Sequence, residues 1–221
     1  MNIRAGAITL AGLLPASRIK NFLLRRCGWK IDLGVVVHPS IFIRIQNVQL
    51  LEGSSTGLFN VFRHLRRLSL GVGATVGQFN WVTGGAPGLP NDDSFLELGE
   101  QSAITSRHYL DASGGITIGK FATLAGERSV LLTHQIDYRE SKQSIGAVTI
   151  GEYSLVSSSV KVVPGAVVPS FSVVAMGSVI TPGLVQENAL YAGVPAVLKR
   201  RDLDGKYFHR SHGPVEPRLG K

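Results

Sequence analysis

The chain has 221 residues, of which 44% are hydrophobic and 17% are charged, so it can bury a core and is not a disordered polar chain. Its net charge of +8 is compatible with nucleic acid, anionic lipid or a phosphorylated ligand, but the absence of a helix-turn-helix, zinc-finger or RNP pattern argues against nucleic acid. The single cysteine, Cys27, excludes an internal disulfide and fits a reducing compartment. The 26 glycines, with no period of three, favour a turn-rich all-β protein.

Residues 1–32 predict an apolar and basic N-terminal cap. The stretch AGAITLAGLL (5–14) is too short to span a bilayer, which needs about 20 residues. A weak signal peptide is one interpretation of it, and an apolar segment packed on the core or on a membrane surface is the favoured one. The next stretch, SRIKNFLLRRCGWKI (17–31), indicates a basic amphipathic helix that lies on an anionic membrane or caps a β-domain. Its apolar side consists of Ile19, Phe22, Leu23 and Cys27.

From residue 150 onward, aliphatic side chains recur every six positions, and a small or short residue stands four positions after them. The aliphatic set is Ile150, Val156, Val162, Val168, Val174 and Ile180, and the small set is Ser154, Val160, Ala166, Ser172 and Ser178. The same spacing occurs earlier, in Leu70, Val76 and Val82, in Leu98, Ile104, Leu110 and Ile116, and in Ile118, Leu124 and Val130. Steps of 20 residues separate Leu98 from Ile118 and Val130 from Ile150, which indicates register slips or loops.

This period predicts a solenoid over residues 33–198, because each hexapeptide supplies a short strand and a tight bend. One turn cannot bury its own interior, so successive turns stack. The two open ends of the stacked sheets need caps, which the first 32 residues and the basic C-terminal tail (199–221) supply.

The stretch IGEYSLVSSSVKVVPGAVVPSFSVVAMGSVIT (150–181), followed by ENALYAGVPAVLKR (187–200), resembles the C-terminal signature of the hexapeptide-repeat acyltransferases. Within that family the chain is most similar to the sugar and polysaccharide O-acetyltransferases of the colanic-acid and maltose or galactoside type. The resemblance covers roughly residues 70–200. It implies an all-β fold, a left-handed parallel β-helix, and a homotrimer with sites between subunits. The hand comes from the resemblance, because crossover chemistry alone favours right-handed connections.

The repeat breaks at residues 83–94 and 133–148, where we expect loops. The second break opens with His134. Acyl transfer from a thioester to a hydroxyl needs a base, and the unperturbed pKa of histidine near 6.5 suits that role. The resemblance places the catalytic histidine at the start of this loop, which matches His134. Either Asp137 or a backbone carbonyl is expected to orient its imidazole.

The resemblance also implies acetyl-CoA as co-substrate, with no metal. By motif position the cofactor contacts are Ser158, Met176, Thr181 and Arg200, with Lys199 as a further phosphate contact. Two departures weaken this match: Pro182 follows Thr181 where many members have lysine, and Val197 stands where many have a basic residue.

The acceptor side is less clearly specified. Asn80 and Trp81 are candidates to hydrogen-bond and stack on a sugar, although a tryptophan at a solenoid corner is equally a packing residue. Tyr138 and Arg139, in the polar excursion, are further substrate candidates. His108 lies at a different point of its turn from His134, so we do not pair the two within a subunit; it stays a substrate candidate for the site of a neighbouring chain.

The sequence therefore predicts an enzyme that transfers an acetyl group from acetyl-CoA to a hydroxyl of a sugar or polysaccharide precursor, in the cytoplasm. The basic N-terminal helix suggests peripheral contact with the inner membrane face. Three alternatives remain open: an N-acyltransferase for an amino sugar, a non-catalytic scaffold solenoid, and a metalloenzyme like the γ-carbonic anhydrases. The last needs three convergent histidines, and His134 is followed by no other histidine until the tail.

Overall fold

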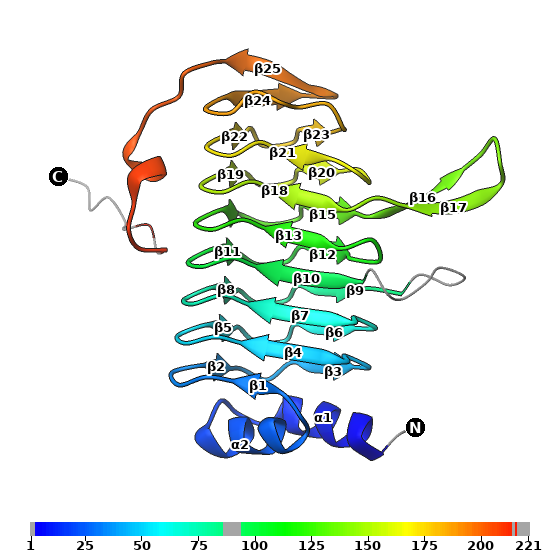
Figure 1. Ribbon diagram of the computed structural model, residues 1–221, viewed down its shortest axis with the longest axis vertical. Helices are drawn as coiled ribbons and strands as arrows, with labels where there is room; N and C mark the ends of the chain where they lie inside the picture. Colours follow the sequence, from blue (N-terminus) through cyan, green and yellow to red (C-terminus); the bar gives the residue numbers. More distant parts are fainter. Residues whose placement is uncertain (1–2, 86–93, 214, 216–221) are drawn as a thin grey trace.

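A computed structural model describes residues 3–85, 94–213 and 215, and shows a left-handed parallel β-helix that carries two helices at its N-terminal end (Figure 1). The predicted fold class is confirmed. The helices are α1 (Ile3–Leu13), α2 (Arg18–Arg26) and, near the C-terminus, the 3-10 helix η2 (Lys206–His209).

Three sheets form the faces of the prism, and the chain visits them in the order A, B, C in each coil. Sheet A contains β1 (Lys30–Ile31), β4 (Asn47–Leu50), β7 (Arg67–Leu70), β10 (Phe95–Leu98), β13 (Ile116–Ile118), β18 (Val148–Ile150) and β21 (Val167–Val168). Sheet B contains β2 (Val36–Val37), β5 (Ser55–Thr56), β8 (Thr75–Val76), β11 (Ala103–Ile104), β14 (Thr123–Leu124), β19 (Leu155–Val156), β22 (Val173–Val174), β24 (Leu190–Gly193) and β25 (Ala196–Arg200). Sheet C contains β3 (Ile41–Ile43), β6 (Val61–Arg63), β9 (Trp81–Thr83), β12 (Tyr109–Asp111), β15 (Val130–Leu132), β20 (Lys161–Val162) and β23 (Val179–Ile180).

The core is a column of mostly aliphatic side chains, joined in the first coils by the stacked rings of Phe42 and Phe62, and the six-residue spacing identifies most of the aliphatic members from residue 70 onward. All members of the aliphatic set from Ile150 to Ile180 are buried, as are the small residues from Ser154 to Ser178 that occupy the corners. One prediction was wrong: Val130 faces outward, and Leu131 takes the inward position with its side chain fully buried. The corner between β14 and β15 is one residue longer than the hexapeptide pattern allows, which shifts the register by one.

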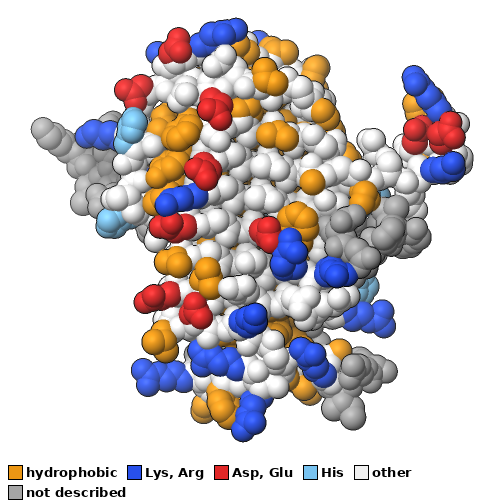
Figure 2. Space-filling model, viewed as in Figure 1, with side chains coloured by type: hydrophobic (Ala, Val, Ile, Leu, Met, Phe, Trp, Pro, Cys, Tyr) orange, Lys and Arg blue, Asp and Glu red, His pale blue; other side chains and the backbone are white. Residues whose placement is uncertain are grey.

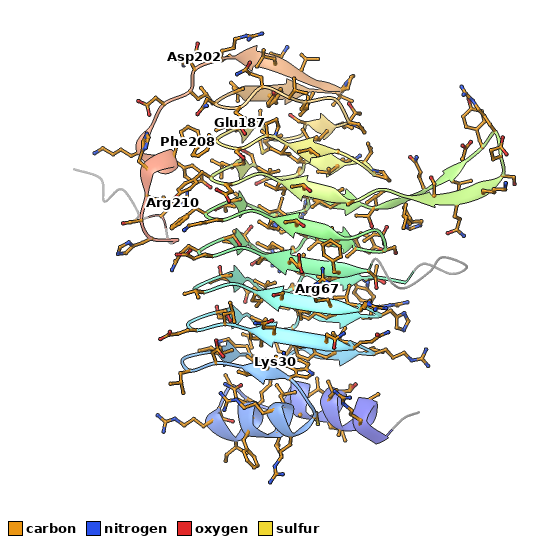
Figure 3. The ribbon with its side chains drawn as sticks, viewed as in Figure 1. Lys30, Arg67, Glu187, Asp202, Phe208 and Arg210 are labelled. Atoms are coloured by element: carbon orange, nitrogen blue, oxygen red, sulfur yellow. The ribbon has the colours of Figure 1, made fainter. Side chains whose placement is uncertain are left out.

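Both predicted cap boundaries move slightly. The first strand, β1, begins at Lys30 and already pairs with β4, so the solenoid starts before residue 33. At the other end Lys199 and Arg200 belong to β25, which pairs antiparallel with β24 and closes sheet B. The segment after β25 runs back along the coils, where Figure 3 labels Phe208 and Arg210. It packs on a column of stacked rings formed by Phe121, Tyr153 and Phe171.

The two predicted excursions leave the prism at the same corner, between sheets C and A. The excursion at 133–148 is an antiparallel hairpin, β16 (His134–Asp137) and β17 (Lys142–Ile145), which projects from the prism (Figure 1). Most of the excursion at 83–94 lies outside the described residues, which resume at Ser94. The interruptions of the hexapeptide pattern therefore mark one edge of the molecule.

The register shift in β15 gives a stability prediction with a matched control on the adjacent residue. Leu131→Ala is expected to lower the free energy of unfolding by about 2–5 kcal/mol, because it leaves a cavity in the column. Val130→Ala removes a partly exposed side chain and should cost less than about 1 kcal/mol. Urea unfolding of both variants measures the difference, and a larger loss for Val130→Ala would show that the register is wrong.

Candidate active site

The candidate site is built around a contact between His134 and Asp111, 23 positions apart in sequence. Asp111 ends β12 and His134 begins β16, so the corner between sheets C and A brings the two side chains together. Nδ1 of His134 makes a short hydrogen bond with Oδ2 of Asp111. Asp111 stands in register with Leu132 of the next coil, directly below the point where the hairpin leaves the prism.

The surroundings of Asp111 fix which nitrogen of His134 carries the proton. Its carboxylate is 3% exposed and accepts hydrogen bonds from the backbone N–H of Ser113 (3.2 Å), the Ser113 hydroxyl (2.7 Å) and the backbone N–H of Thr133 (3.3 Å). An ionised carboxylate can only accept hydrogen bonds, so Nδ1 of His134 must carry the proton that it donates to Asp111. Nε2 then carries the lone pair, with no partner among the described residues, on a side chain that is 36% exposed. A free imidazole nitrogen held by a buried carboxylate is the arrangement of a general base.

The structure places Asp137 elsewhere, so the expectation that it orients His134 is wrong. Its carboxylate accepts hydrogen bonds from the backbone N–H groups of Arg139 (2.8 Å) and Glu140 (3.4 Å) and so closes the turn of its own hairpin. Asp111 lies outside the excursion, 23 positions before His134, so the local sequence around His134 does not point to it. The signal was present one coil below, as a carboxylate that ends a strand directly beneath the excursion.

Two of the predicted acceptor contacts are structural residues inside the corner between sheets B and C. Asn80 is 1% exposed: its side-chain NH₂ donates to the Thr105 carbonyl (2.8 Å), and its Oδ1 accepts from the backbone N–H of His108 (2.9 Å). His108 is 2% exposed, contacts the Thr105 hydroxyl through Nε2 (3.0 Å) and accepts from the backbone N–H of Ser129 through Nδ1 (3.1 Å). Burial lowers the pKa of His108 to about 4, so its ring is neutral at pH 7. The prediction that either residue binds substrate was wrong.

Trp81 lies on the outer surface, on the same face of sheet C as Asp111. It is 43% exposed and stands in register with Tyr109, two residues before Asp111 on the neighbouring strand. Tyr138 and Arg139 are exposed at the tip of the hairpin, roughly 14 Å along β16 from His134. The chain therefore brings Trp81 near the His134–Asp111 pair, and holds the hairpin tip away from it.

The predicted cofactor contacts fall at three separate places. Ser158 and Met176 lie in successive coils at the corner between sheets B and C, where the backbone N–H of Gly177 donates to the Ser158 carbonyl (3.1 Å). Gly126 lies beneath Ser158 with φ of +71°, and a Cβ there would come within 1.6 Å of the Ser158 hydroxyl, so the coils can approach only because residue 126 is glycine. Thr181 directly follows β23, so it lies across the width of sheet C from the corner that holds Ser158 and Met176. Lys199 and Arg200 lie on β25, at the C-terminal end of the prism.

Within the described ranges, no group of three or more His, Cys, Asp or Glu side chains is arranged to hold a metal ion. No described helix is long and apolar enough to cross a membrane.

No protein-family model matches the chain, and the search of curated proteins gives no match. Solved structures match its fold. A single-residue variant of AntD, an N-acyltransferase from Bacillus cereus bound to dTDP-4-amino-4,6-dideoxyglucose and coenzyme A, has a TM-score of 0.53 at 14% identity, over 84% of this chain and 89% of that one.

A hexapeptide-repeat acetyltransferase from Vibrio cholerae has a TM-score of 0.50 at 16% identity, over 91% of this chain and 90% of that one. PerB from Caulobacter crescentus, solved with CoA and GDP-perosamine, has a TM-score of 0.48 at 19% identity. This match covers 83% of the chain and 66% of PerB. At these identities, the matches to AntD and to the Vibrio cholerae acetyltransferase show a shared fold and nothing more.

The buried His108 predicts a loss of stability in acid. Its folded pKa of about 4 lies below the unfolded value near 6.5, so the unfolded chain binds more protons between these two pH values. The free energy of unfolding should therefore fall by up to about 3 kcal/mol from this group as the pH is lowered from about 6.5 to about 4. Urea titrations across that range, with His108→Gln as the comparison, measure the effect. An equal pH slope in the two proteins would contradict this assignment.

Proposed function

We propose that the protein transfers an acetyl group from acetyl-CoA to a hydroxyl of a sugar or polysaccharide precursor, with His134 as general base. The observation that carries the proposal is the His134–Asp111 pair, with its free Nε2 at the surface of a hexapeptide-repeat solenoid. A solenoid that served only as a scaffold would need no buried carboxylate to orient an exposed imidazole.

The reaction follows from this geometry. Nε2 of His134 takes the proton of the acceptor hydroxyl as the oxygen attacks the thioester carbonyl carbon. Asp111 stabilises the imidazolium that forms, through the hydrogen bond it already makes with Nδ1. The tetrahedral intermediate then collapses, the C–S bond breaks, and the leaving thiolate accepts the proton that Nε2 took from the hydroxyl. The products are the acetyl ester and free CoA.

We propose a homotrimer in which each site uses two copies of the chain. His134 lies at the corner between sheets C and A, whereas Ser158 and Met176 lie at the corner between sheets B and C. The width of sheet C separates these corners by roughly 15 Å. A cofactor bound at Ser158 and Met176 would therefore reach His134 of a neighbouring copy more readily than His134 of its own copy. Apolar side chains exposed along the outer face of sheet C support such an association: Ile41, Ile43, Trp81, Tyr109 and Leu132.

Acetyl-CoA fits the remaining charge distribution. Lys199 and Arg200 are exposed at the end of the coil column and would pair with its phosphates. CoA is present in the AntD structure, which supports the same co-substrate here. Acetyl-CoA is available in the cytoplasm, where we place the protein. On the acceptor side, Trp81 offers an aromatic surface to a sugar near His134, and Tyr138 and Arg139 reach outward to a neighbouring copy.

An amino sugar is the second candidate acceptor. AntD is an N-acyltransferase whose structure holds an amino-dideoxy sugar nucleotide, and its fold is similar to this one. A panel that pairs each amino sugar with its hydroxyl counterpart separates the two chemistries by their products, an amide or an ester. Acetylation of amino sugars alone would replace the O-acetyl proposal.

Removing the base or its partner should abolish most of the activity. We expect His134→Ala to lower kcat by about 10²–10⁴-fold, and Asp111→Asn by at least about 10²-fold, because the amide no longer fixes the tautomer. Asp137→Asn leaves the pair intact and should cost less than about tenfold. Thiol release from acetyl-CoA in the presence of a sugar and glycan panel measures all three.

For these variants, circular dichroism and melting temperature are the controls for folding. A large loss from Asp137→Asn with none from Asp111→Asn would restore the sequence-based assignment. Absence of both acetyl-CoA binding and turnover in the wild type would favour the scaffold.

A mixing experiment tests the shared site. His134→Ala removes the base, and Ser158→Tyr is designed to block the cofactor corner. If each site takes His134 from one copy and Ser158 from another, co-expression in equal amounts should restore about one quarter of the wild-type rate. If both residues act within one copy, the mixed protein stays as inactive as its parents.

A further inference from the structure

Helices α1 and α2 form a layer that closes the N-terminal end of the prism (Figure 1). Their inner sides bury Ile8, Ala11 and Leu24 against the first coil. The fully buried Lys20 donates from Nζ to the carbonyls of Gly12 (2.7 Å), Leu14 (2.9 Å) and His38 (3.0 Å). These bonds join both helices and the first coil, so the layer is a fixed part of the fold.

The outer side of the same layer is apolar and uncovered within the described chain. Six large apolar side chains are exposed there, among them Leu10 at 71%, Ile19 at 70% and Phe22 at 54%. The remaining three are Leu13, Leu14 and Leu23. On α2, residues 19, 22, 23 and 26 share one helical face, opposite the buried Lys20 and Leu24. We call these six side chains the end surface.

The charged side chains around the end surface are predominantly basic, with the exposed Asp32 beside Arg25. Residues 1–31 contain no Asp or Glu, and Arg18, Arg25, Arg26 and Lys30 are all exposed. The Arg26 guanidinium lies 5.4 Å from the ring centre of Phe22, so a cation borders the apolar surface directly. On the side visible in Figure 2, this end shows blue and orange side chains and no red ones.

We propose that the end surface docks the protein on an anionic lipid bilayer. Exposed aliphatic and aromatic side chains between arginines match the acyl boundary and the phosphates of such a surface. A second copy is a poorer partner, because two identical basic ends would face each other with like charges. Neither helix can span the bilayer, so the contact is peripheral.

Docking in this way sets the height of the active site, a consequence that rests on the proposed function. Sheet C rises from β3 to β15, which precedes His134, in four strand spacings of about 4.8 Å each. With the helix layer below, His134 lies roughly 20–30 Å from the lipid. An acceptor that suits this geometry is a glycan carried on a membrane lipid and acetylated on a sugar away from the lipid anchor.

Flotation of the full chain with vesicles tests the proposal. We expect binding to phosphatidylcholine vesicles that contain phosphatidylglycerol, and at least about tenfold weaker partition to phosphatidylcholine alone or in high salt. Arg18→Gln with Arg26→Gln, and separately Ile19→Ser with Phe22→Ser, should each weaken partition by about tenfold or more. The matched controls are Lys120→Gln and Val185→Ser, an exposed cation and an exposed apolar residue on other coils, which should leave partition unchanged.

Three results would overturn the proposal: no flotation, equal binding to neutral and anionic vesicles, or equal loss in the control variants. A doubling of the solution mass that Phe22→Ser abolishes would assign the end surface to a second copy instead. Turnover of a water-soluble acceptor by the Ile19→Ser, Phe22→Ser variant keeps the two claims separate. If this variant loses flotation but turns over the soluble acceptor at the wild-type rate, docking is supported. If neither the wild type nor any variant shows turnover, the proposed function alone is contradicted.

Discussion

The fold depends on hydrogen bonding between successive coils, which leaves no room for chemistry inside the prism. Strand pairs such as β12 and β15 stack in register, so most inward strand positions hold an aliphatic or aromatic side chain, and most corners hold a small or hydrogen-bonded one. Asn80 and His108 obey this rule. The side chain of Asn80 bonds to Thr105 and His108 of the next coil, whereas His108 bonds to Thr105 of its own coil and to Ser129 of the next. Reactive groups must therefore lie on the outer faces, where the pattern is interrupted.

The hairpin at 133–148 is such an interruption, and it converts an outward position of sheet C into a buried one. In other coils that position holds exposed or partly exposed residues, such as Ile43 and Thr83. Under the start of the hairpin it holds Asp111, which receives hydrogen bonds from Thr133 and His134 of the excursion and from Ser113 of its own coil. One insertion thus supplies the imidazole and also desolvates the carboxylate that orients it.

Much of this could be predicted from the sequence, because hexapeptide spacing reports directly on which side chains face inward. The aliphatic column and the positions of the two excursions were accessible in this way, whereas His134 was singled out by the family resemblance and its role as base is our proposal. Asp111 was not, since its partner comes from the next coil, and only the three-dimensional stacking shows that the end of β12 lies under the start of β16. Val130 and Leu131 illustrate a second limit. One additional residue in the preceding corner exchanges the inward and outward positions of the strand, and both residues are aliphatic, so the residue types do not reveal the exchange.

The central claim is that acetyl-CoA binds between two copies of the chain with its thioester at Nε2 of His134. A crystal structure of the 221-residue chain with CoA is the decisive measurement. We expect a threefold assembly in which the CoA sulfur lies within a few ångströms of Nε2, and in which the copy that supplies His134 is not the copy that supplies Ser158 and Met176. A cofactor bound within a single copy, with its sulfur at a corner remote from His134, would contradict the account.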